Sequence, residues 1–181
     1  MANRILIEGG KPLAGEVPIS GMKNAALPIV FATVLVGGVS VLENIPPISD
    51  ITRSLDILRQ MGASVSFLDR TTVRIDTSAV TPGSSPDALV CRIRGSSYLV
   101  GAELGRFRHA DCALPGGCDF GSRPLDLHIK GFEALGATVR CGNRMQADAP
   151  DGLHGATVYF DKSSVGATVN VMLASVMADG L

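Results

Sequence analysis

The first third of the chain carries a long apolar stretch followed by a short alternating one. A glycine at position 21 precedes a mainly apolar run that continues to the pair Gly37-Gly38. This pattern predicts a turn at Gly21, a helix with large apolar surface, and a helix end at the glycine pair. The next residues, 39–44, alternate in the manner of a short strand.

The following segment has the periodicity of an amphipathic helix. Apolar residues recur at helical spacing over 51–61, from Ile51 to Met61, and Ser49-Asp50 immediately before them resemble a helix cap. Gly62 then ends the predicted helix. Two strands are expected next, over 64–68 and 72–75.

Parts of this order of elements recur later in the chain. Residues 125–139 resemble residues 54–65, since both read as an amphipathic helix, a Gly-Ala pair and a β-branched strand. Residues 165–180 resemble the helix after Gly21, including a terminal glycine. Helices that alternate with strands in this way predict an α/β fold built from repeating units.

The last repeating unit, the third, begins with the helix predicted from residue 165. It lacks most of the strands that the first unit contains. Because a repeat buries its apolar face against its neighbours, an isolated helix at this position has no complete partner. We therefore expect the 181 residues to be part of a longer protein, with a chance ending as the alternative.

Composition limits the class of protein. Apolar residues make up 46% of the chain and charged residues 18%, which favours a folded domain with a sizeable core over disorder. The net charge is −1 and no basic stripe is present, so nothing supports nucleic-acid binding. The longest apolar stretch, from Ala25 to Val36, contains Pro28 and is too short to span a membrane. We expect a soluble cytoplasmic protein without membrane contacts.

The cysteines and histidines do not form a recognisable metal or disulfide pattern. The four cysteines have no C-x-x-C spacing, the three histidines lie at no metal-ligand interval, and the N-terminus does not resemble a signal peptide. We expect reduced thiols and no metal. Two histidines and three of the cysteines carry no further signal.

Cys118 differs because of its surroundings. It lies in the segment Leu114-Pro-Gly-Gly-Cys118-Asp-Phe-Gly-Ser-Arg123-Pro124-Leu-Asp126, which cannot continue a helix or a central strand. A loop thiol beside a cation ionises more readily than a buried one, which predicts a reactive cysteine. The alternative is a turn that contains a small apolar residue.

Several cations stand close to the glycine turns. Lys23 and Asn24 follow Gly21, Arg123 follows Cys118, Arg94 ends an apolar run, and Lys162 with Ser164 precedes the glycine at 166. Each cation alone is explained as a solvated surface charge. Together they place cations beside helix N-termini, where backbone N–H groups attract anions, and this pattern suits a phosphorylated substrate.

Two residues near the start of the 125–139 helix have simpler explanations. His128 is expected to be packed or solvated rather than catalytic. Asp126 is explained as a first-turn acid that the helix dipole favours.

Four segments carry a resemblance to a known family. They are Gly21-Met-Lys-Asn-Ala-Ala-Leu-Pro, Leu114-Pro-Gly-Gly-Cys, Arg123-Pro-Leu-Asp-Leu-His and Ser164-Val-Gly-Ala-Thr. These segments closely resemble the UDP-N-acetylglucosamine enolpyruvyl transferases, and the resemblance extends over essentially the whole chain. The cysteine loop followed by Arg-Pro-x-Asp is its most specific part, because the related shikimate-pathway enzymes share the architecture but lack this loop.

The resemblance implies a fold and an activity. Family members consist of two lobes, each an inside-out α/β barrel of three βαβαββ units. Residues 17–181 would form a truncated lobe with an incomplete third repeat, and residues 1–16 a strand segment that belongs to the second lobe. The implied reaction moves the enolpyruvyl group of phosphoenolpyruvate to the 3′-hydroxyl of UDP-N-acetylglucosamine, early in peptidoglycan synthesis, and needs no cofactor.

The resemblance also implies roles for individual residues. Cys118 would form a covalent adduct with phosphoenolpyruvate or donate a proton, and would be the thiol that fosfomycin alkylates. Lys23, Arg94 and Arg123 would bind phosphoenolpyruvate. The residues implied for UDP-N-acetylglucosamine are Asn24, Arg94, Arg123, Pro124, Leu125, Asp126, Lys162, Ser164, Val165 and Gly166.

The chain also departs from the family pattern. The turn before the second helix often carries a lysine that reaches the active site, whereas here it reads Pro46-Pro-Ile-Ser-Asp50. The aspartate and arginines that the second half of the family contributes have no counterpart. Two hypotheses follow: an incomplete enzyme that requires its C-terminal half, or a non-catalytic module that binds the UDP-sugar or regulates cell-wall synthesis.

Overall fold

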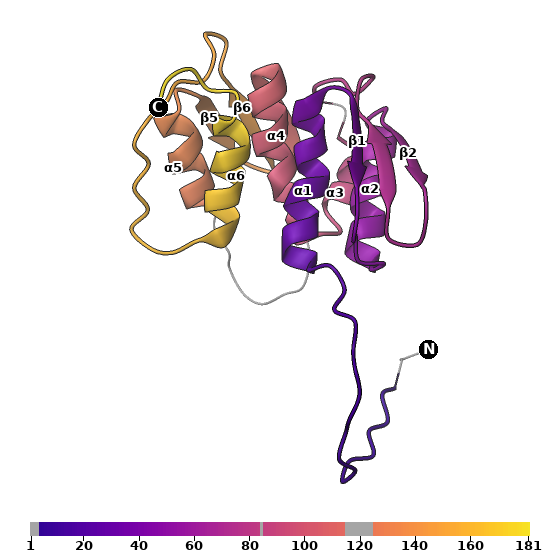
Figure 1. Cartoon of the computed structure of the whole chain (residues 1–181). Coiled ribbons are helices and arrows are strands. Elements are labelled where there is room, and N and C mark those ends of the chain that lie inside the picture. Colours follow the sequence, from indigo (N-terminus) through magenta and orange to yellow (C-terminus); the bar gives the residue numbers. More distant parts are fainter. Residues whose placement is uncertain (1–3, 84, 115–124) are drawn as a thin grey trace.

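The computed structural model describes residues 4–83, 85–114 and 125–181, which form an α/β domain with two small sheets (Figure 1). Each sheet has three antiparallel strands, in the order β1-β3-β2 and β4-β6-β5. The first sheet and its helices are α1 (Lys23–Val36), β1 (Val39–Leu42), α2 (Ser49–Gln60), β2 (Ser64–Phe67) and β3 (Val73–Asp76). The remaining elements are α3 (Asp87–Val90), η1 (Arg94–Ser97), α4 (Tyr98–Phe107), β4 (His109–Ala113), α5 (Asp126–Ala134), β5 (Thr138–Cys141), β6 (Arg144–Asp148) and α6 (Val165–Ser175).

The elements predicted for the first unit are confirmed, with small shifts at their ends. Helix α1 ends at Gly37, whose left-handed conformation (φ 62°) explains why a glycine stands there. Strand β1 is two residues shorter than the predicted 39–44. The prediction that Ser49 and Asp50 precede the second helix is wrong: they form its first turn, and Ile48 is the N-cap.

The two sheets are built in the same way. Gly62 after α2 and Gly136 after α5 both have positive φ, 105° and 93°. The next residue in each case, Ala63 or Ala137, donates its N–H back to a carbonyl five residues earlier, at Leu58 or Phe132. These equivalent helix ends lead into β2 and β5, as the recurring Gly-Ala pairs predicted.

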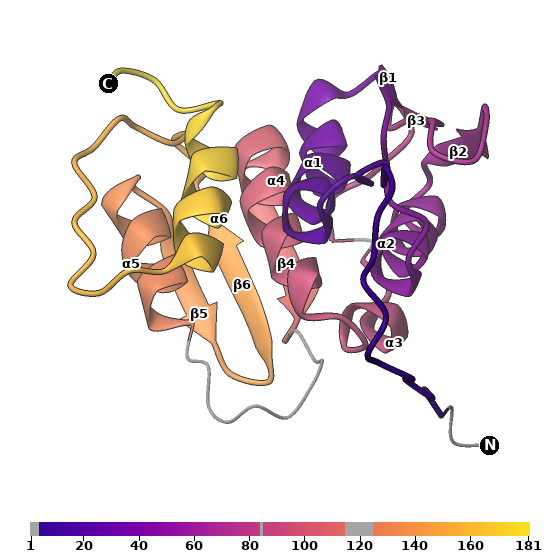
Figure 2. The ribbon, with the colours of Figure 1, turned by 60° about the horizontal axis from the view of Figure 1, so that its bottom comes forward.

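Helix α4 lies at the centre of the domain and was not predicted. It is placed between α1 and α6 and packs against β4 (Figure 2). Its residues from Leu99 to Gly105 are all buried, including Glu103.

Helix α6 was predicted and begins at Val165, but it ends at Ser175, five residues before the glycine that was expected to stop it. The cause lies in tertiary contacts. Asp179 donates its N–H to the Leu153 carbonyl and pairs in a parallel bridge with His154, and this pairing draws the chain out of the helix.

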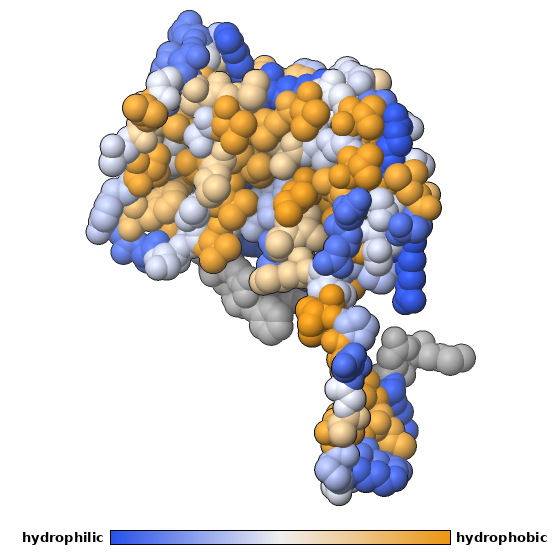
Figure 3. Space-filling view, viewed as in Figure 1, coloured by the Kyte–Doolittle hydropathy of each residue, from blue (hydrophilic) through white to orange (hydrophobic). Residues whose placement is uncertain are grey.

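Two surface features concern apolar residues. The N-terminal segment, residues 4–20, extends away from the domain, with Ile5, Leu6 and Ile7 each more than 80% exposed (Figure 1). Apolar side chains also lie on the visible face of the domain (Figure 3). Among the exposed apolar residues, Ile29 of α1 and Met172 of α6 are about half exposed. Among the described helices, none has the length and apolar character needed to cross a bilayer.

Candidate functional site

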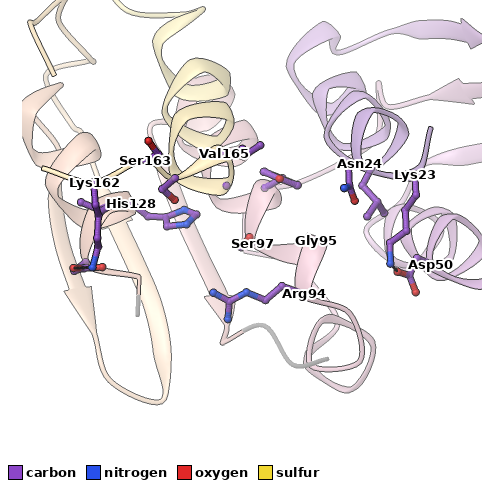
Figure 4. A pocket seen from close by; sticks show the side chains of 16 residues that line it. Lys23, Asn24, Asp50, Arg94, Gly95, Ser97, His128, Lys162, Ser163 and Val165 are labelled. Carbon is purple, nitrogen blue, oxygen red and sulfur yellow. Dashed lines mark ion pairs between the residues drawn. The ribbon is translucent and has the colours of Figure 1, made fainter. Parts of the chain in front are cut away.

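The ends of several helices surround an open cavity of about 590 Å³ (Figure 4). Its walls come from the N-terminal ends of α1, α5 and α6 and from η1 with the first residue of α4. The first N–H groups of a helix have no acceptor within the helix, and the helix dipole places partial positive charge there. Several such ends around one cavity make it suitable for an anionic ligand.

Helix α1 brings Lys23 and Asn24 to the cavity as its first two residues. The N-cap, Met22, has no side chain that could cap the helix, and its carbonyl accepts from Ala25 and Ala26. The N–H groups of Lys23 and Asn24 therefore lie at the open end of the helix. The Lys23 ammonium forms an ion pair with the Asp50 carboxylate of α2, which also lines the cavity.

Helix α6 begins on the opposite wall. The Ser164 hydroxyl accepts a hydrogen bond from the Ala167 N–H at 3.2 Å and so caps the helix. The next two amides, of Val165 and Gly166, remain at the helix end. Lys162 precedes them, and its ammonium lies 3.6 Å from the Asp126 carboxylate at the start of α5.

Arg94 and His128 lie between these two walls (Figure 4). Arg94 begins η1, and His128 is buried in the first turn of α5. Burial and then the positive charge of Arg94 lower the pKa of His128 to about 4, against the opposing effect of Asp126. The imidazole is therefore neutral at neutral pH, and the structure confirms that His128 is a packed residue.

Eight of the residues predicted from the sequence line this cavity together. They are Lys23, Asn24, Arg94, Asp126, Lys162, Ser164, Val165 and Gly166. Leu125 does not line it; it precedes α5 and packs against the core. Cys118, Arg123 and Pro124 lie outside the described residues.

The structure adds lining residues that the sequence did not indicate. Asp50 had been interpreted only as a helix cap, and Gly95, Ser97 and Tyr98 belong to the unpredicted η1 and α4. The ion pair of Asp50 with Lys23 joins residues 27 positions apart, so no local pattern could have indicated it. Within the described ranges, no group of three or more His, Cys, Asp or Glu residues is placed to hold a metal ion.

The charges in the cavity suit a ligand with more than one anionic group. Three cations, Lys23, Arg94 and Lys162, are distributed over both walls, and two carboxylates, Asp50 and Asp126, form ion pairs with two of them. The ion-paired side chains are between 24% and 63% exposed, so these pairs are weak and a ligand can replace them.

Comparison with known proteins identifies the family. The family model for EPSP synthase (3-phosphoshikimate 1-carboxyvinyltransferase) matches residues 7–181, which is nearly the whole chain. The chain belongs to the EPSP synthase family. Within this family it is similar to UDP-N-acetylglucosamine 1-carboxyvinyltransferases, with 46% identity to proteins of Clostridium acetobutylicum and Listeria innocua and 45% to one of Streptococcus pneumoniae. The matches cover 98–99% of this chain but only 42–43% of each relative, so the chain spans less than half of their length.

Solved structures of the EPSP synthase family agree in fold. The enolpyruvyl transferase NikO from Streptomyces tendae superposes with a TM-score of 0.77 at 25% identity, over 95% of this chain and 41% of that protein. EPSP synthase from Acinetobacter baumannii has a TM-score of 0.66 at 17% identity, over 92% and 39% of the two chains, and supports the fold alone.

Proposed function

We propose that the chain provides one substrate-binding face of an enzyme that transfers the enolpyruvyl group of phosphoenolpyruvate to the 3′-hydroxyl of UDP-N-acetylglucosamine. The observation that carries the proposal is the cavity, where eight residues from four separate segments meet around the ends of three helices. The similarity to UDP-N-acetylglucosamine 1-carboxyvinyltransferases supports UDP-N-acetylglucosamine as the acceptor and the 1-carboxyvinyl (enolpyruvyl) group as the group transferred. The reaction would take place in the bacterial cytoplasm as the first committed step of peptidoglycan synthesis, without a cofactor.

The two walls would divide the substrates between them. Lys23 and Arg94, with Arg123, would hold the phosphate and carboxylate of phosphoenolpyruvate. Fixed cations of this kind stabilise negative charge as it develops on the leaving phosphate. Asn24 would hold the sugar of the acceptor substrate.

The α6 wall would bind the nucleotide part of UDP-N-acetylglucosamine. The amides of Val165 and Gly166 stand at a helix N-terminus, where a diphosphate is favoured, and Lys162 adds a cation there. The proposed contacts of this substrate also include Arg94, Arg123, Pro124, Leu125, Asp126 and Ser164.

Cys118 is the residue proposed to act on phosphoenolpyruvate. A thiol can donate a proton to C3 of the enol or attack C2, where positive charge develops. We therefore expect fosfomycin to alkylate Cys118 in preference to the other three cysteines, and mass spectrometry of the labelled chain can locate the adduct.

The proposed enzyme has more parts than these 181 residues. Residues 17–181 would form most of one lobe, an inside-out α/β barrel of βαβαββ units with an incomplete third unit. Residues 1–16 would pack against a second lobe, which would give the exposed apolar side chains of Ile5, Leu6 and Ile7 a partner. The C-terminal half of the enzyme would be the partner needed for turnover.

Binding can be tested on the chain itself. Calorimetric titration with UDP-N-acetylglucosamine should show saturable binding, and Lys162→Ala should weaken it by about 3- to 30-fold, as expected for the loss of a cation near phosphate. Arg70→Ala is the matched control, because this cation lies in the turn between β2 and β3 and does not line the cavity. Equal loss in both variants would count against the α6 wall as the nucleotide site.

A non-catalytic role is the second candidate, because the described cavity residues could bind an anionic ligand without the thiol of Cys118. In this case the chain would bind the UDP-sugar or regulate cell-wall synthesis. Phosphate release from both substrates, measured with and without the C-terminal half of a relative added in trans, separates the two functions. Restored turnover supports the enzyme, whereas binding without turnover in both conditions supports the module.

A further inference from the structure

Asn170 of α6 is fully buried and links three elements by hydrogen bonds. Its Oδ1 accepts from the backbone N–H of Gly101 in α4 at 2.9 Å. Its Nδ2 lies 2.8 Å from the carbonyl oxygen of Ser97 and 2.9 Å from Nδ1 of His128. All three partners are at least 42 residues away in the sequence.

These contacts determine where the proton of His128 lies. A backbone N–H can only donate, so the amide atom next to Gly101 must be the oxygen of Asn170. The other amide atom is then the nitrogen, a donor, which matches the Ser97 carbonyl. Because this nitrogen also donates to Nδ1 of His128, Nδ1 must carry a lone pair, and the proton of the neutral ring is on Nε2.

The helices α4 and α6 approach each other closely at Asn170. A Cβ atom at position 101 would lie 2.2 Å from the Asn170 carbonyl oxygen and 2.4 Å from Oδ1, so only glycine allows this close approach. On the other side of the ring, a Cβ at Gly166 would lie 3.6 Å from Nε2. The Nε2 edge of the ring therefore borders the start of α6, in the wall of the cavity (Figure 4).

We propose that Asn170 is a positioning residue that holds His128 as a neutral imidazole and presents its Nε2–H to a phosphate oxygen of the ligand. The inference rests on the proposed function and deepens it, because it assigns a neutral donor to the diphosphate wall between Gly166 and Arg94. A neutral donor contributes a hydrogen bond whose strength does not change with pH near neutrality.

The surroundings keep the ring neutral. Asn170 and Gly166 face it from α6 without charge, Arg94 faces it from η1 with a positive charge, and Asp126 lies two residues earlier on its own helix. Burial and the positive charge of Arg94 outweigh the attraction of Asp126. An imidazolium at this position would also have to break the hydrogen bond from Asn170, because both ring nitrogens would be donors.

The variant Asn170→Asp tests this arrangement with little change in shape. The carboxylate can still accept from the Gly101 N–H, but its second oxygen has no hydrogen for Nδ1 of His128 or for the Ser97 carbonyl, and it can only accept a hydrogen bond from a protonated Nδ1. We expect the pKa of His128 to rise, and the neutral ring to carry its proton on Nδ1. The cation would still present Nε2–H to the ligand, whereas the neutral ring of this variant would not.

Two measurements report the result. In the wild-type chain, ¹⁵N NMR of the imidazole should show an unprotonated Nδ1 and a protonated Nε2 from about pH 6 to pH 8. Calorimetric affinity for UDP-N-acetylglucosamine should be nearly constant over the same range. In Asn170→Asp we expect the affinity to fall by about 10- to 100-fold as the pH rises through the pKa of His128, the range for a lost hydrogen bond to a charged group.

Several outcomes would overturn the inference. One is a proton on Nδ1 in the wild-type chain, and this measurement remains decisive if Asn170→Asp does not fold. Another is an equal loss of affinity at every pH in Asn170→Asp, which would indicate a structural role alone. Failure of the wild-type chain to bind UDP-N-acetylglucosamine at any pH would refute the proposed function instead, while the protons on the ring would still decide whether Asn170 sets the tautomer.

Discussion

The thiol of Cys112 in β4 donates a hydrogen bond to the carboxyl group of Glu103 in α4, with 3.3 Å between Sγ and Oε2. Both residues are buried, and among the described side chains Oε1 of Glu103 is a buried oxygen without a hydrogen-bond partner. Burial raises the pKa of Glu103 from 4.5 to about 7, and it also raises the pKa of the Cys112 thiol. A carboxyl group in the centre of the domain therefore changes its protonation near pH 7, well above the usual range of a glutamate.

This buried acid makes the stability of the domain depend on pH. In the unfolded chain Glu103 ionises near pH 4.5, whereas in the folded chain it ionises near pH 7. The contribution of Glu103 to the free energy of unfolding is fully present at low pH. It is lost as the pH rises from 4.5 to about 7, by up to roughly 3 kcal/mol. Glu103→Gln should remove this loss. Urea unfolding of both proteins across the range measures it, and parallel profiles for the two would contradict the prediction.

His128 has the opposite effect in an overlapping range. The pKa of His128 in the folded chain is about 4, below the usual 6.5. Its contribution to the free energy of unfolding is therefore lost as the pH falls from 6.5 towards 4. Where the two pH ranges overlap, the effects of Glu103 and His128 oppose each other. The stability of the wild-type chain should therefore change little with pH there. We expect the stability of Glu103→Gln to rise with pH in this range, and that of His128→Gln to fall.

Gly101 is predicted to be intolerant of a side chain. Its Cβ would meet the backbone and side-chain oxygens of Asn170 at 2.2 Å and 2.4 Å, and a backbone contact cannot be relieved by rotating a side chain. Gly101→Ala should lower the free energy of unfolding by about 2–4 kcal/mol through overpacking. Gly142→Ala is the matched control, because no atom lies within 4 Å of its Cβ position. Equal stability of both variants would show that α4 and α6 can separate without cost.

The cap of α6 is predicted to contribute to stability. Ser164 accepts from the Ala167 N–H, and removal of such a cap costs about 1 kcal/mol. Ser164→Ala should therefore be less stable by this amount, whereas Ser163→Ala, one residue outside the cap, should change the free energy of unfolding by less than about 0.5 kcal/mol. Chemical denaturation of the two variants provides the comparison, and the prediction is wrong if they cannot be distinguished.

Asp50 is predicted to compete with anionic ligands. Its carboxylate is paired with Lys23 inside the cavity, and it must give up this contact when phosphate binds. Asp50→Asn should tighten the binding of phosphoenolpyruvate by about two- to fivefold at low salt, since it removes a negative charge from the site. Thermal stability should change little, because the ammonium is half exposed. Weaker binding would mean that Asp50 orients Lys23 for the ligand.

Part of the site was accessible to sequence reasoning because its residues stand in local patterns. Lys23, Asn24 and Gly166 each lie at a helix start that glycine or serine marks, and the structure brings them to one cavity. His128 was expected to be packed or solvated, and the structure shows that it is packed. Its contact with Asn170 could not be derived from the sequence. Asn170 is 42 residues away in another helix, and no local pattern links the two residues.

The sequence by itself determined the elements whose pattern is local: the α1 helix with its glycine stop, the amphipathic α2 with the strands that follow, and the recurrence of this order at α5. Hydrophobic periodicity and glycine positions encode such elements because each depends on neighbours within a few residues. Only the tertiary structure decided that α4 is central, that α6 ends at Ser175, and that Asn170 sets the proton of His128. These features depend on contacts between residues that are far apart in the sequence, such as those of Asn170 with Gly101, Ser97 and His128, and no local pattern encodes such contacts.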